Sequence, residues 1–191
     1  MLNIVIFGAP GSGKGTQSEK LVAKYALQHV STGEILRDEI EANTELGKLA
    51  GTYMSKGELV PDRIVIDMLD SLIEKKRHVK GFIFDGFPRT VTQGEALSKM
   101  LSKHDEDVNA VISLEVDDGE LVDRLLKRGQ ISGRSDDNRE TIEARLKVYY
   151  NQTSPLKEFY RAQGILKEID GVGTVDEIFQ TIANEIDQLI K

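Results

Sequence analysis

A glycine-rich run near the N-terminus constrains the fold of this chain more than any other feature. Residues 8–16 read Gly-Ala-Pro-Gly-Ser-Gly-Lys-Gly-Thr; they follow the apolar stretch 4–7 and lead into helix formers around Leu21. Glycines let the chain turn sharply from a strand into a helix, so that several backbone N–H groups point at one anion. A plain turn would explain two glycines, but four glycines with Lys14 and Thr16 predict a nucleoside triphosphate site.

The loop departs from the usual pattern in one respect, because Gly15 separates Lys14 from the hydroxyl of Thr16. We expect Lys14 to act as a mobile point charge on the outer phosphates, and Thr16 to lie near a Mg²⁺ ion bound by the nucleotide. The residues expected to bind the triphosphate here are Gly11, Ser12, Gly13, Lys14, Gly15 and Thr16.

Five apolar runs bounded by turn residues predict five β-strands. They are residues 3–7, 28–30, 81–84, 110–116 and 165–169. Continuous apolar runs, rather than alternating ones, are typical of parallel strands that are buried on both faces. With helical patterns between them, these strands predict an α/β protein with three α/β/α layers around a five-stranded parallel sheet.

Four capping residues, each followed by a glutamate three positions later, predict helix starts. The pairs are Ser31 with Glu34, Asp117 with Glu120, Asp137 with Glu140 and Thr174 with Glu177. We expect the first of these helices to end near Glu41 and the second to end at Gly129. The third is expected to reach about Tyr160 with a kink at Pro155.

Two segments interrupt the alternation of strands and helices. Residues 31–60 contain two helical patterns where a crossover needs one, and residues 128–137 form a polar, glycine-containing stretch that we expect to be a loop. Both are expected at the edge of the sheet where ligands of α/β proteins bind. The predicted core domain therefore comprises residues 1–30, 61–127 and 138–191.

An acidic residue and a set of arginines point to the same edge. Asp85 follows an apolar strand, where such a carboxylate commonly faces Mg²⁺ through water, although it could simply cap the next turn. Arg124 and Arg128 are four residues apart on one predicted helix face, where like charges repel. A bound polyanion would remove that conflict, whereas the alternative is two solvated surface side chains. Further arginines in or beside the two interrupting segments are Arg37, Arg134 and Arg145, and Arg89 ends the turn that follows Asp85.

The composition excludes several classes of partner and site. The 191 residues carry a net charge of −7 and include no cysteine. A nucleic-acid surface would normally be basic, and disulfides or thiolate-bound zinc need cysteine. No apolar run approaches the length of a membrane span, and the first residues lack a charged segment with a cleavage site. We therefore expect a cytoplasmic protein with neither nucleic acid nor membrane as partner.

Taken together, four motifs resemble the hallmarks of nucleoside monophosphate kinases, in order along essentially the whole chain. They are residues 8–16, 85–89 (Asp-Gly-Phe-Pro-Arg), 124–128 (Arg-x-x-x-Arg) and 133–137 (Gly-Arg-x-Asp-Asp). Within that family the chain resembles the short-lid adenylate kinases. The resemblance implies a P-loop fold with a helical monophosphate-binding insert at 31–60 and a short lid at 128–137.

The resemblance also implies the reaction, which is reversible transfer from MgATP to AMP to give two ADP. Mg²⁺ is then the cofactor, no structural zinc is expected, and the partners of the monomeric enzyme are ATP, AMP and ADP. It assigns catalytic roles to Lys14, Arg89, Arg124, Arg128, Arg134 and Arg145, and adds Arg128 and Gly173 to the ATP site. Asp136 and Asp137 are expected to orient lid arginines.

The AMP site implied by the resemblance lies between the insert and the turn after Asp85. Its residues are Thr32, Arg37, Glu58, Leu59, Val60, Gly86, Phe87, Pro88, Arg89, Gln93, Arg134 and Arg145. Thr32 accompanies adenine in the family, and the amide of Gln93 can donate to one ring position and accept from the exocyclic amine. The short lid is shared with UMP/CMP kinases, which remain the alternative within the family.

Two alternatives come from other classes of protein. A P-loop switch GTPase would need an Asn-Lys-x-Asp motif to read guanine, and the sequence contains none. A nucleotide-binding scaffold without kinase activity would tolerate loss of the charged residues, yet Lys14, Asp85 and all the arginines named above are present.

Overall fold

The centre of the molecule is one parallel five-stranded β-sheet with strand order β2-β3-β1-β4-β5. We describe it from a computed structural model that covers residues 1–76 and 78–189. The strands are β1 (Ile4–Gly8), β2 (Gln28–Ser31), β3 (Phe82–Asp85), β4 (Ala110–Glu115) and β5 (Leu166–Asp170). All five lie within two residues of their predicted positions, so the predicted α/β sheet is confirmed.

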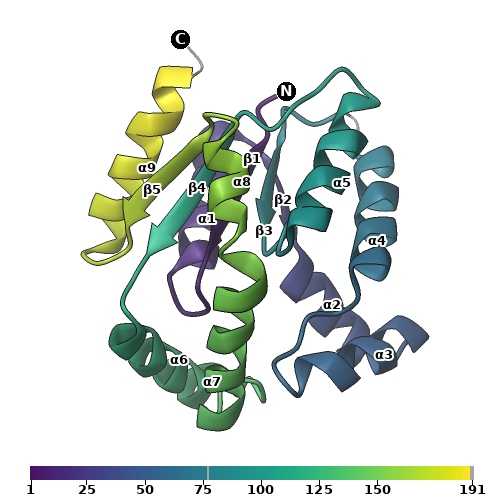
Figure 1. Ribbon diagram of the computed structural model, residues 1–191, viewed down its shortest axis with the longest axis vertical. Helices are drawn as coiled ribbons and strands as arrows, with labels where there is room; N and C mark the ends of the chain where they lie inside the picture. The colour runs from purple at the N-terminus through teal and green to yellow at the C-terminus, as the bar shows by residue number, and fades with distance from the viewer. Residues whose placement is uncertain (77, 190–191) are drawn as a thin grey trace.

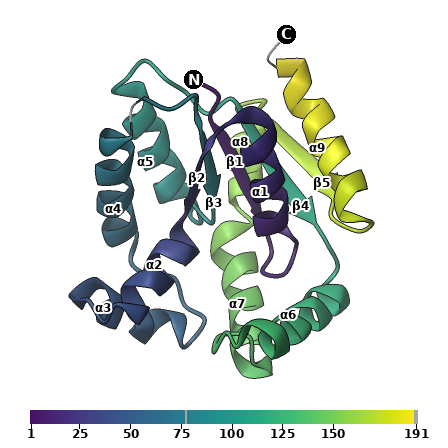
Figure 2. The same cartoon turned by 180° about the vertical axis from the view of Figure 1, so that it is seen from behind.

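Helices cover both faces of this sheet (Figures 1 and 2). They are α1 (Lys14–Tyr25), α2 (Thr32–Glu41), α3 (Glu45–Met54), α4 (Asp62–Lys75), α5 (Val91–Ser102), α6 (Asp118–Ser132), α7 (Arg139–Val148), the π-helical turn η1 (Tyr149–Thr153), α8 (Leu156–Arg161) and α9 (Val175–Leu189). None of the helices in the described part of the chain has both the length and the apolar character needed to cross a membrane.

Alternate side chains of β1 enter two separate hydrophobic cores. Ile4 and Ile6 are fully buried in the core that includes apolar residues of α1 and α9. Val5 and Phe7 belong to the other core, which includes residues of α5 and α8. A strand that is apolar on both faces needs cover on both sides, which explains the three layers. Helices α1 and α9 lie in front of the sheet in Figure 2, and α5 and α8 lie in front of it in Figure 1.

Two pairs of helices extend beyond the carboxyl ends of the strands. Helices α2 and α3 lie on one side of this end of the sheet, and α6 and α7 on the other, as Figure 1 shows. The two predicted helical stretches within 31–60 are confirmed as α2 and α3. The chain termini lie at the opposite end of the molecule. The glycine-rich loop, which connects β1 to α1, lies at the same end of the sheet as the two helix pairs.

The predicted end of the helix at Gly129 is wrong. Helix α6 continues to Ser132 and ends at Gly133, which has a left-handed φ of 65°. Gly129 meets a packing demand instead, because a Cβ there would lie 2.9 Å from the carbonyl oxygen of Asp137. Residues 128–132, which we expected in a loop, therefore form the last turn of α6.

The predicted start of the next helix is also wrong by one residue. Asn138, not Asp137, is the N-cap of α7, since its side-chain oxygen accepts from the backbone N–H of Thr141 at 3.0 Å. The single long helix expected up to Tyr160 is divided into α7, the wide turn η1 and α8. The wide turn precedes Pro155, whose nitrogen has no hydrogen to donate to a carbonyl four residues earlier.

Candidate active site

A cleft of about 580 Å³ opens at the carboxyl ends of the strands. Its walls come from the glycine-rich loop, the turn after β3, the insert helices and the segment from α6 to α7. Most of the residues predicted for the site line this cleft: Gly11, Ser12, Gly13, Lys14, Gly15, Thr16, Arg37, Leu59, Asp85, Gly86, Pro88, Arg89, Arg124, Arg128, Arg134, Arg145 and Gly173.

The glycine-rich loop folds around the side chain of its own lysine. Lys14 Nζ donates to the carbonyl oxygens of Gly8 at 2.8 Å and Ala9 at 3.0 Å. Gly13, at the start of α1, has a left-handed φ of 93°, and nothing lies within 4 Å of where its Cβ would be. The loop therefore presents open backbone and an ammonium group to the cleft, which is the arrangement that binds an anion.

Burial lowers the pKa of Lys14 to about 8, because the ammonium group loses hydration in the cleft. The carboxylate of Asp85 works against this fall, while the neighbouring positive charges of Arg89 and Arg145 add to it. A cation that is this poorly compensated gains strongly from a bound anion, so the electrostatics favour a phosphate ligand at this position.

Asp85 ends β3 beside the first turn of α1. Burial would by itself raise the pKa of its carboxyl, but His29, Lys14 and Arg89 together hold that pKa below its ordinary value. Nε2 of His29 lies 3.6 Å from Oδ2 of Asp85, which is an ion-pair distance rather than a hydrogen bond. The carboxylate is therefore ionised at neutral pH.

A magnesium ion bound to a nucleotide fits the oxygen atoms at this place. A Cβ on Gly15 would lie 3.9 Å from Oδ2 of Asp85, so the carboxylate faces the turn that also carries the Thr16 hydroxyl. Mg²⁺ usually takes one or two protein oxygens and fills its remaining positions with water and phosphate. Within residues 1–76 and 78–189 no group of three or more His, Asp or Glu side chains is arranged to hold a metal ion by itself.

Two arginines meet above a glycine on the other side of the cleft. A Cβ on Gly33 would lie 3.4 Å from both terminal nitrogens of Arg37 and 3.6 Å from Nη2 of Arg89. Nε of Arg89 donates to the carbonyl oxygen of Gly86 at 2.7 Å, and the hydroxyl of Thr32 donates to the same oxygen at 2.7 Å. Two guanidinium groups therefore lie close over Gly33, where a side chain longer than a methyl group would meet them, and this arrangement can bind a second anion.

Burial and neighbouring positive charges lower the pKa of both of these arginines. The pKa of Arg89 falls to about 10, mainly through burial and then through the charge of Arg145. The pKa of Arg37 is also lowered, by burial first and by Arg134 second. Because each remains charged at neutral pH, the two guanidinium groups share a desolvated, positively charged space.

A buried carboxylate holds two further arginines at the edge of the cleft. Asp137 is 5% exposed and accepts from Nε and Nη2 of Arg128 at 2.6 and 2.7 Å, and from Nη1 of Arg145 at 2.9 Å. Burial alone would raise the pKa of Asp137, but these arginines lower it. Arg145 also pairs with Asp136 at 2.9 Å. Both aspartates therefore orient arginines.

The expected repulsion between Arg124 and Arg128 is removed inside the protein. Arg124 pairs with Glu120 on its own helix and donates to the carbonyl oxygen of Gly171 at 3.1 Å, while Arg128 turns to Asp137. Each arginine thus has its own oxygen partners, so a bound polyanion is not needed to explain their spacing.

Five residues predicted for the site do not line the cleft. Thr32, Val60, Phe87 and Gln93 are buried behind its wall, and Glu58 is exposed outside it. The hydroxyl of Thr32 is bonded to Gly86, as described above, and the amide of Gln93 is bonded within the protein at both ends. The side chains expected to read the base therefore support the cleft from behind.

Sequence reasoning missed several residues that shape the site. Gly33 and His29 contact predicted residues, and Gly57 brings the insert against α7, since its Cβ would lie 3.0 Å from Cγ of Arg145. Gly57 has a left-handed φ of 74°. In the sequence, only the glycine itself is a weak signal for such a turn, because glycine adopts a left-handed φ more readily than other residues. No local pattern marks His29, because its partner Asp85 is distant in the sequence.

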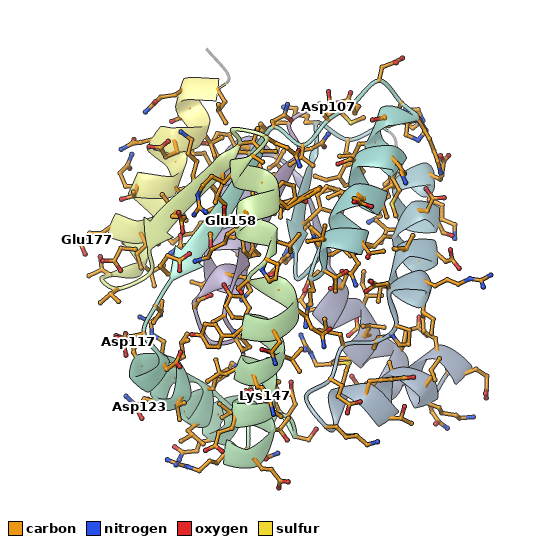
Figure 3. The ribbon with its side chains drawn as sticks, viewed as in Figure 1. Asp107, Asp117, Asp123, Lys147, Glu158 and Glu177 are labelled. Atoms are coloured by element: carbon orange, nitrogen blue, oxygen red, sulfur yellow. The ribbon has the colours of Figure 1, made fainter. Side chains whose placement is uncertain are left out.

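The cleft is positive although the whole chain is negative. Seven basic side chains and three carboxylates line it, the carboxylates being Glu19, Glu34 and Asp85. The exposed acidic residues Asp117, Asp123 and Glu177 lie on the outer side of the molecule, as Figure 3 shows. Two groups of basic side chains within one cationic cleft can hold two phosphate-bearing molecules close together.

Comparison with known proteins identifies relatives along the whole chain. A family model described as adenylate kinase matches residues 6–165. The adenylate kinase of Parabacteroides distasonis is 53% identical over 189 residues, which cover 99% of this chain and all of that protein. Those of Bacteroides thetaiotaomicron and Porphyromonas gingivalis are 54% identical over 189 residues and 52% identical over 191 residues; these alignments cover at least 98% of each chain.

Proposed function

Since the chain belongs to the adenylate kinase family, we propose that its two anion sites hold ATP and AMP and that it converts them reversibly into two ADP. The resemblance seen in its motifs is confirmed, and the protein is a phosphotransferase of the nucleoside monophosphate kinase type. The two anion sites divide the reaction into a donor half, which binds ATP, and an acceptor half, which binds AMP.

The convergence of seven basic side chains from separate chain segments on one cleft carries the proposal. The second ionisation of a phosphate monoester has a pKa of about 6, so the attacking oxygen is already deprotonated near neutral pH and needs no general base. The remaining demands are to align two mutually repelling anions and to stabilise the charge that develops between them. Fixed positive groups in a desolvated cleft meet both demands.

The donor half is the glycine-rich loop with Lys14. Its open N–H groups and the ammonium group would bind the β- and γ-phosphates of ATP. Arg124 and Arg128 would approach those phosphates from α6, and the backbone at Gly173 would lie against the adenine. Binding would draw Lys14 Nζ away from the carbonyl oxygens of Gly8 and Ala9, which hold it in the ligand-free loop.

The acceptor half lies over Gly33. Arg37 and Arg89 would bind the AMP phosphate, and Arg145 would reach the transferred group from α7. Thr32 and Gln93 lie behind the wall of the empty cleft, so they would meet the adenine, together with the chain at 58–60, only after AMP binding moves that wall aside. In this assignment residues 31–60 are the monophosphate-binding insert and residues 128–137, with Arg134, are the lid.

Magnesium is the proposed cofactor, bound through the nucleotide. Asp85 is ionised and faces the turn of Gly15 and Thr16, so these oxygen atoms would hold the ion through water. Bound Mg²⁺ neutralises phosphate charge and orients the β- and γ-phosphates. The sequence also predicts a monomeric, cytoplasmic enzyme without a nucleic-acid partner, and these remain predictions.

Water can accept the phosphoryl group in place of AMP, which would hydrolyse ATP. The cleft must therefore close before transfer. We propose that the insert and the lid move towards each other once both nucleotides are bound, and that reopening limits turnover. Single-turnover transfer should then be faster than kcat; a transfer step slower than lid opening would contradict this.

A coupled assay for ADP formation tests the proposed function. At equal enzyme, ATP and Mg²⁺, AMP should be the preferred acceptor over UMP, CMP and GMP. Replacing Lys14 by methionine should lower the transfer rate more than a hundredfold, whereas Lys20→Met, an exposed change on the same helix, should not. ATP consumption that does not depend on any monophosphate, or near-normal activity of Lys14→Met, would refute the proposal.

A further inference from the structure

The side-chain amide of Gln93 is held at both ends by groups of opposite hydrogen-bonding character. Oε1 of Gln93 accepts from the backbone N–H of Arg89 at 2.7 Å. Nε2 of Gln93 donates to Oδ1 of Asp62 at 2.8 Å. The side chain is only 2% exposed, so water does not replace these partners.

These two partners fix which way the amide points. A backbone N–H can only donate and a carboxylate oxygen accepts, so the oxygen of Gln93 faces Arg89 and its nitrogen faces Asp62. The opposite orientation would bring N–H against N–H at one end and oxygen against oxygen at the other. The orientation thus follows from the chemistry of the partners.

Asp62 is itself held in place from α5. Its second oxygen, Oδ2, accepts from the hydroxyl of Thr90 at 2.9 Å, and that hydroxyl accepts from the backbone N–H of Gln93 at 3.2 Å. Asp62 is the first residue of α4, and it directly follows Pro61 where the chain leaves the insert. Helices α4 and α5 lie side by side in Figures 1 and 2. One carboxylate therefore ties the first turns of two helices together and locks the amide between them.

We propose that Asp62 is a positioning residue that fixes the hydrogen-bond polarity of Gln93 and thereby selects adenine in the acceptor half. This rests on the proposed function, in which Gln93 faces the base of the monophosphate. Each end of an amide has a second hydrogen-bonding position, so the locked Gln93 keeps one acceptor and one donor in a fixed order. The cleft wall covers these positions in the empty protein, and the proposal requires that AMP binding uncovers them.

Adenine matches this order and a 6-oxopurine does not. Adenine presents the N6 amine as donor and N1 as acceptor, whereas hypoxanthine presents O6 as acceptor and N1–H as donor. To match hypoxanthine, the amide of Gln93 would have to turn over and lose its bonds to both Arg89 and Asp62. A polar group that is fixed in this way rejects the wrong ligand because a buried donor or acceptor would be left unpaired.

AMP and IMP are the probes that test the proposal, since their bases differ in the order of these groups. Asp62→Ala removes the acceptor for Nε2 of Gln93 and should raise the KM for AMP about tenfold. The ratio of kcat/KM for AMP over IMP should fall by about the same factor, while the KM for ATP stays within twofold. Asp62→Asn can still offer an oxygen to Nε2 and should restore most of the ratio.

Two further variants keep the test decisive. Asp62→Glu retains the charge at the start of α4 but moves the carboxylate by one methylene, so it should lower the ratio several-fold even if Asp62→Ala folds poorly. Asp67→Ala removes an exposed carboxylate from the same helix and should leave the ratio unchanged. Thermal unfolding of each variant reports its stability separately.

Three results separate the possible failures. If Asp62→Ala and Asp62→Glu lower the activity with AMP and IMP equally, the role of Asp62 is merely structural and the proposal is wrong. If both leave the ratio within twofold of the wild type, Asp62 does not set the polarity and the proposal is again wrong. If the wild type phosphorylates no AMP, the proposed function fails instead.

Discussion

Replacing Lys14 by methionine should stabilise the ligand-free protein at neutral pH even though it abolishes transfer. Burial lowers the pKa of Lys14 from 10.5 to about 8, which corresponds to an unfavourable contribution of about 3 kcal/mol to folding at pH 7. Methionine removes that contribution but leaves the carbonyl oxygens of Gly8 and Ala9 without their donor, at a cost of about 1–2 kcal/mol. The expected net gain is about 1–2 kcal/mol.

The pH dependence of this gain identifies its cause. Between about pH 8 and pH 10.5 the unfolded chain still binds a proton on Lys14 that the folded protein has released, so the wild type gains stability as the pH rises through this interval. Below pH 8 the unfavourable contribution is present in full. The advantage of Lys14→Met should therefore be largest at pH 7 and should disappear, or reverse, as the pH approaches 10.

Thermal and urea unfolding of both proteins without nucleotide or Mg²⁺ measure the difference. A gain of about 1–2 kcal/mol corresponds to a rise in Tm of about 2–8 °C for a chain of this length. Lys20→Met, which removes an exposed ion pair with Asp176 from the same helix, should change Tm little and without dependence on pH. Saturating ATP should reverse the order, because only the wild type binds it tightly. A lower Tm for Lys14→Met at pH 7, or a pH-independent gain, would refute the reasoning.

Three other perturbations test separate parts of the site. Asp137→Ala leaves Arg128 without its carboxylate partner and Arg145 with Asp136 alone, and it should lower the free energy of unfolding by about 2 kcal/mol, less than for a fully buried pair because both arginines are partly exposed; urea unfolding that shows no loss would contradict this. Gly33→Leu should raise the KM for AMP about tenfold or more by displacing both guanidinium groups that lie over it, with the KM for ATP nearly unchanged; equal effects on both nucleotides in steady-state kinetics would argue against two separate halves. EDTA should stop transfer until Mg²⁺ is restored without shifting the Tm of the ligand-free protein; a large fall in that Tm would indicate a structural metal.

The strands were predictable because the information that specifies them is local. Each is a short apolar run between turn residues, and burial on both faces gives it the same pattern along its whole length. The caps at Ser31 and Thr174 were predictable for the same reason, and each accepts from the N–H three residues later. The end of α6 was not, because a glycine that ends a helix and a glycine such as Gly129, which makes room for another segment, look identical in sequence.

The parts of the site that could be predicted are the motifs that lie directly at the carboxyl ends of strands. The glycine-rich loop follows β1 and Asp85 ends β3, and adjacent parallel strands bring these ends together. The roles of Gly33 and Asp62 depend on contacts with side chains that are distant in the sequence, such as Arg89 and Gln93. Such contacts are set by how α2, α4 and α5 pack, and no periodicity within one segment encodes them.

The charges that would bind nucleotides also oppose closure of the empty cleft. Arg37 lies on the proposed insert and Arg134 on the proposed lid; the positive charge of Arg134 helps lower the pKa of Arg37 while Asp136 works against this, so the two arginines repel each other across the cleft. A polyanion between them would convert this repulsion into attraction towards a common centre, which restricts closure to the loaded enzyme. Because the chain has no cysteine, Thr52→Cys and Gln130→Cys allow specific labelling of the insert and the lid helix. Without nucleotide, the distance between the labels should shorten as salt rises from about 10 mM to about 0.5 M, since salt screens the repulsion. An unchanged distance would mean that packing, rather than charge, holds the empty cleft open.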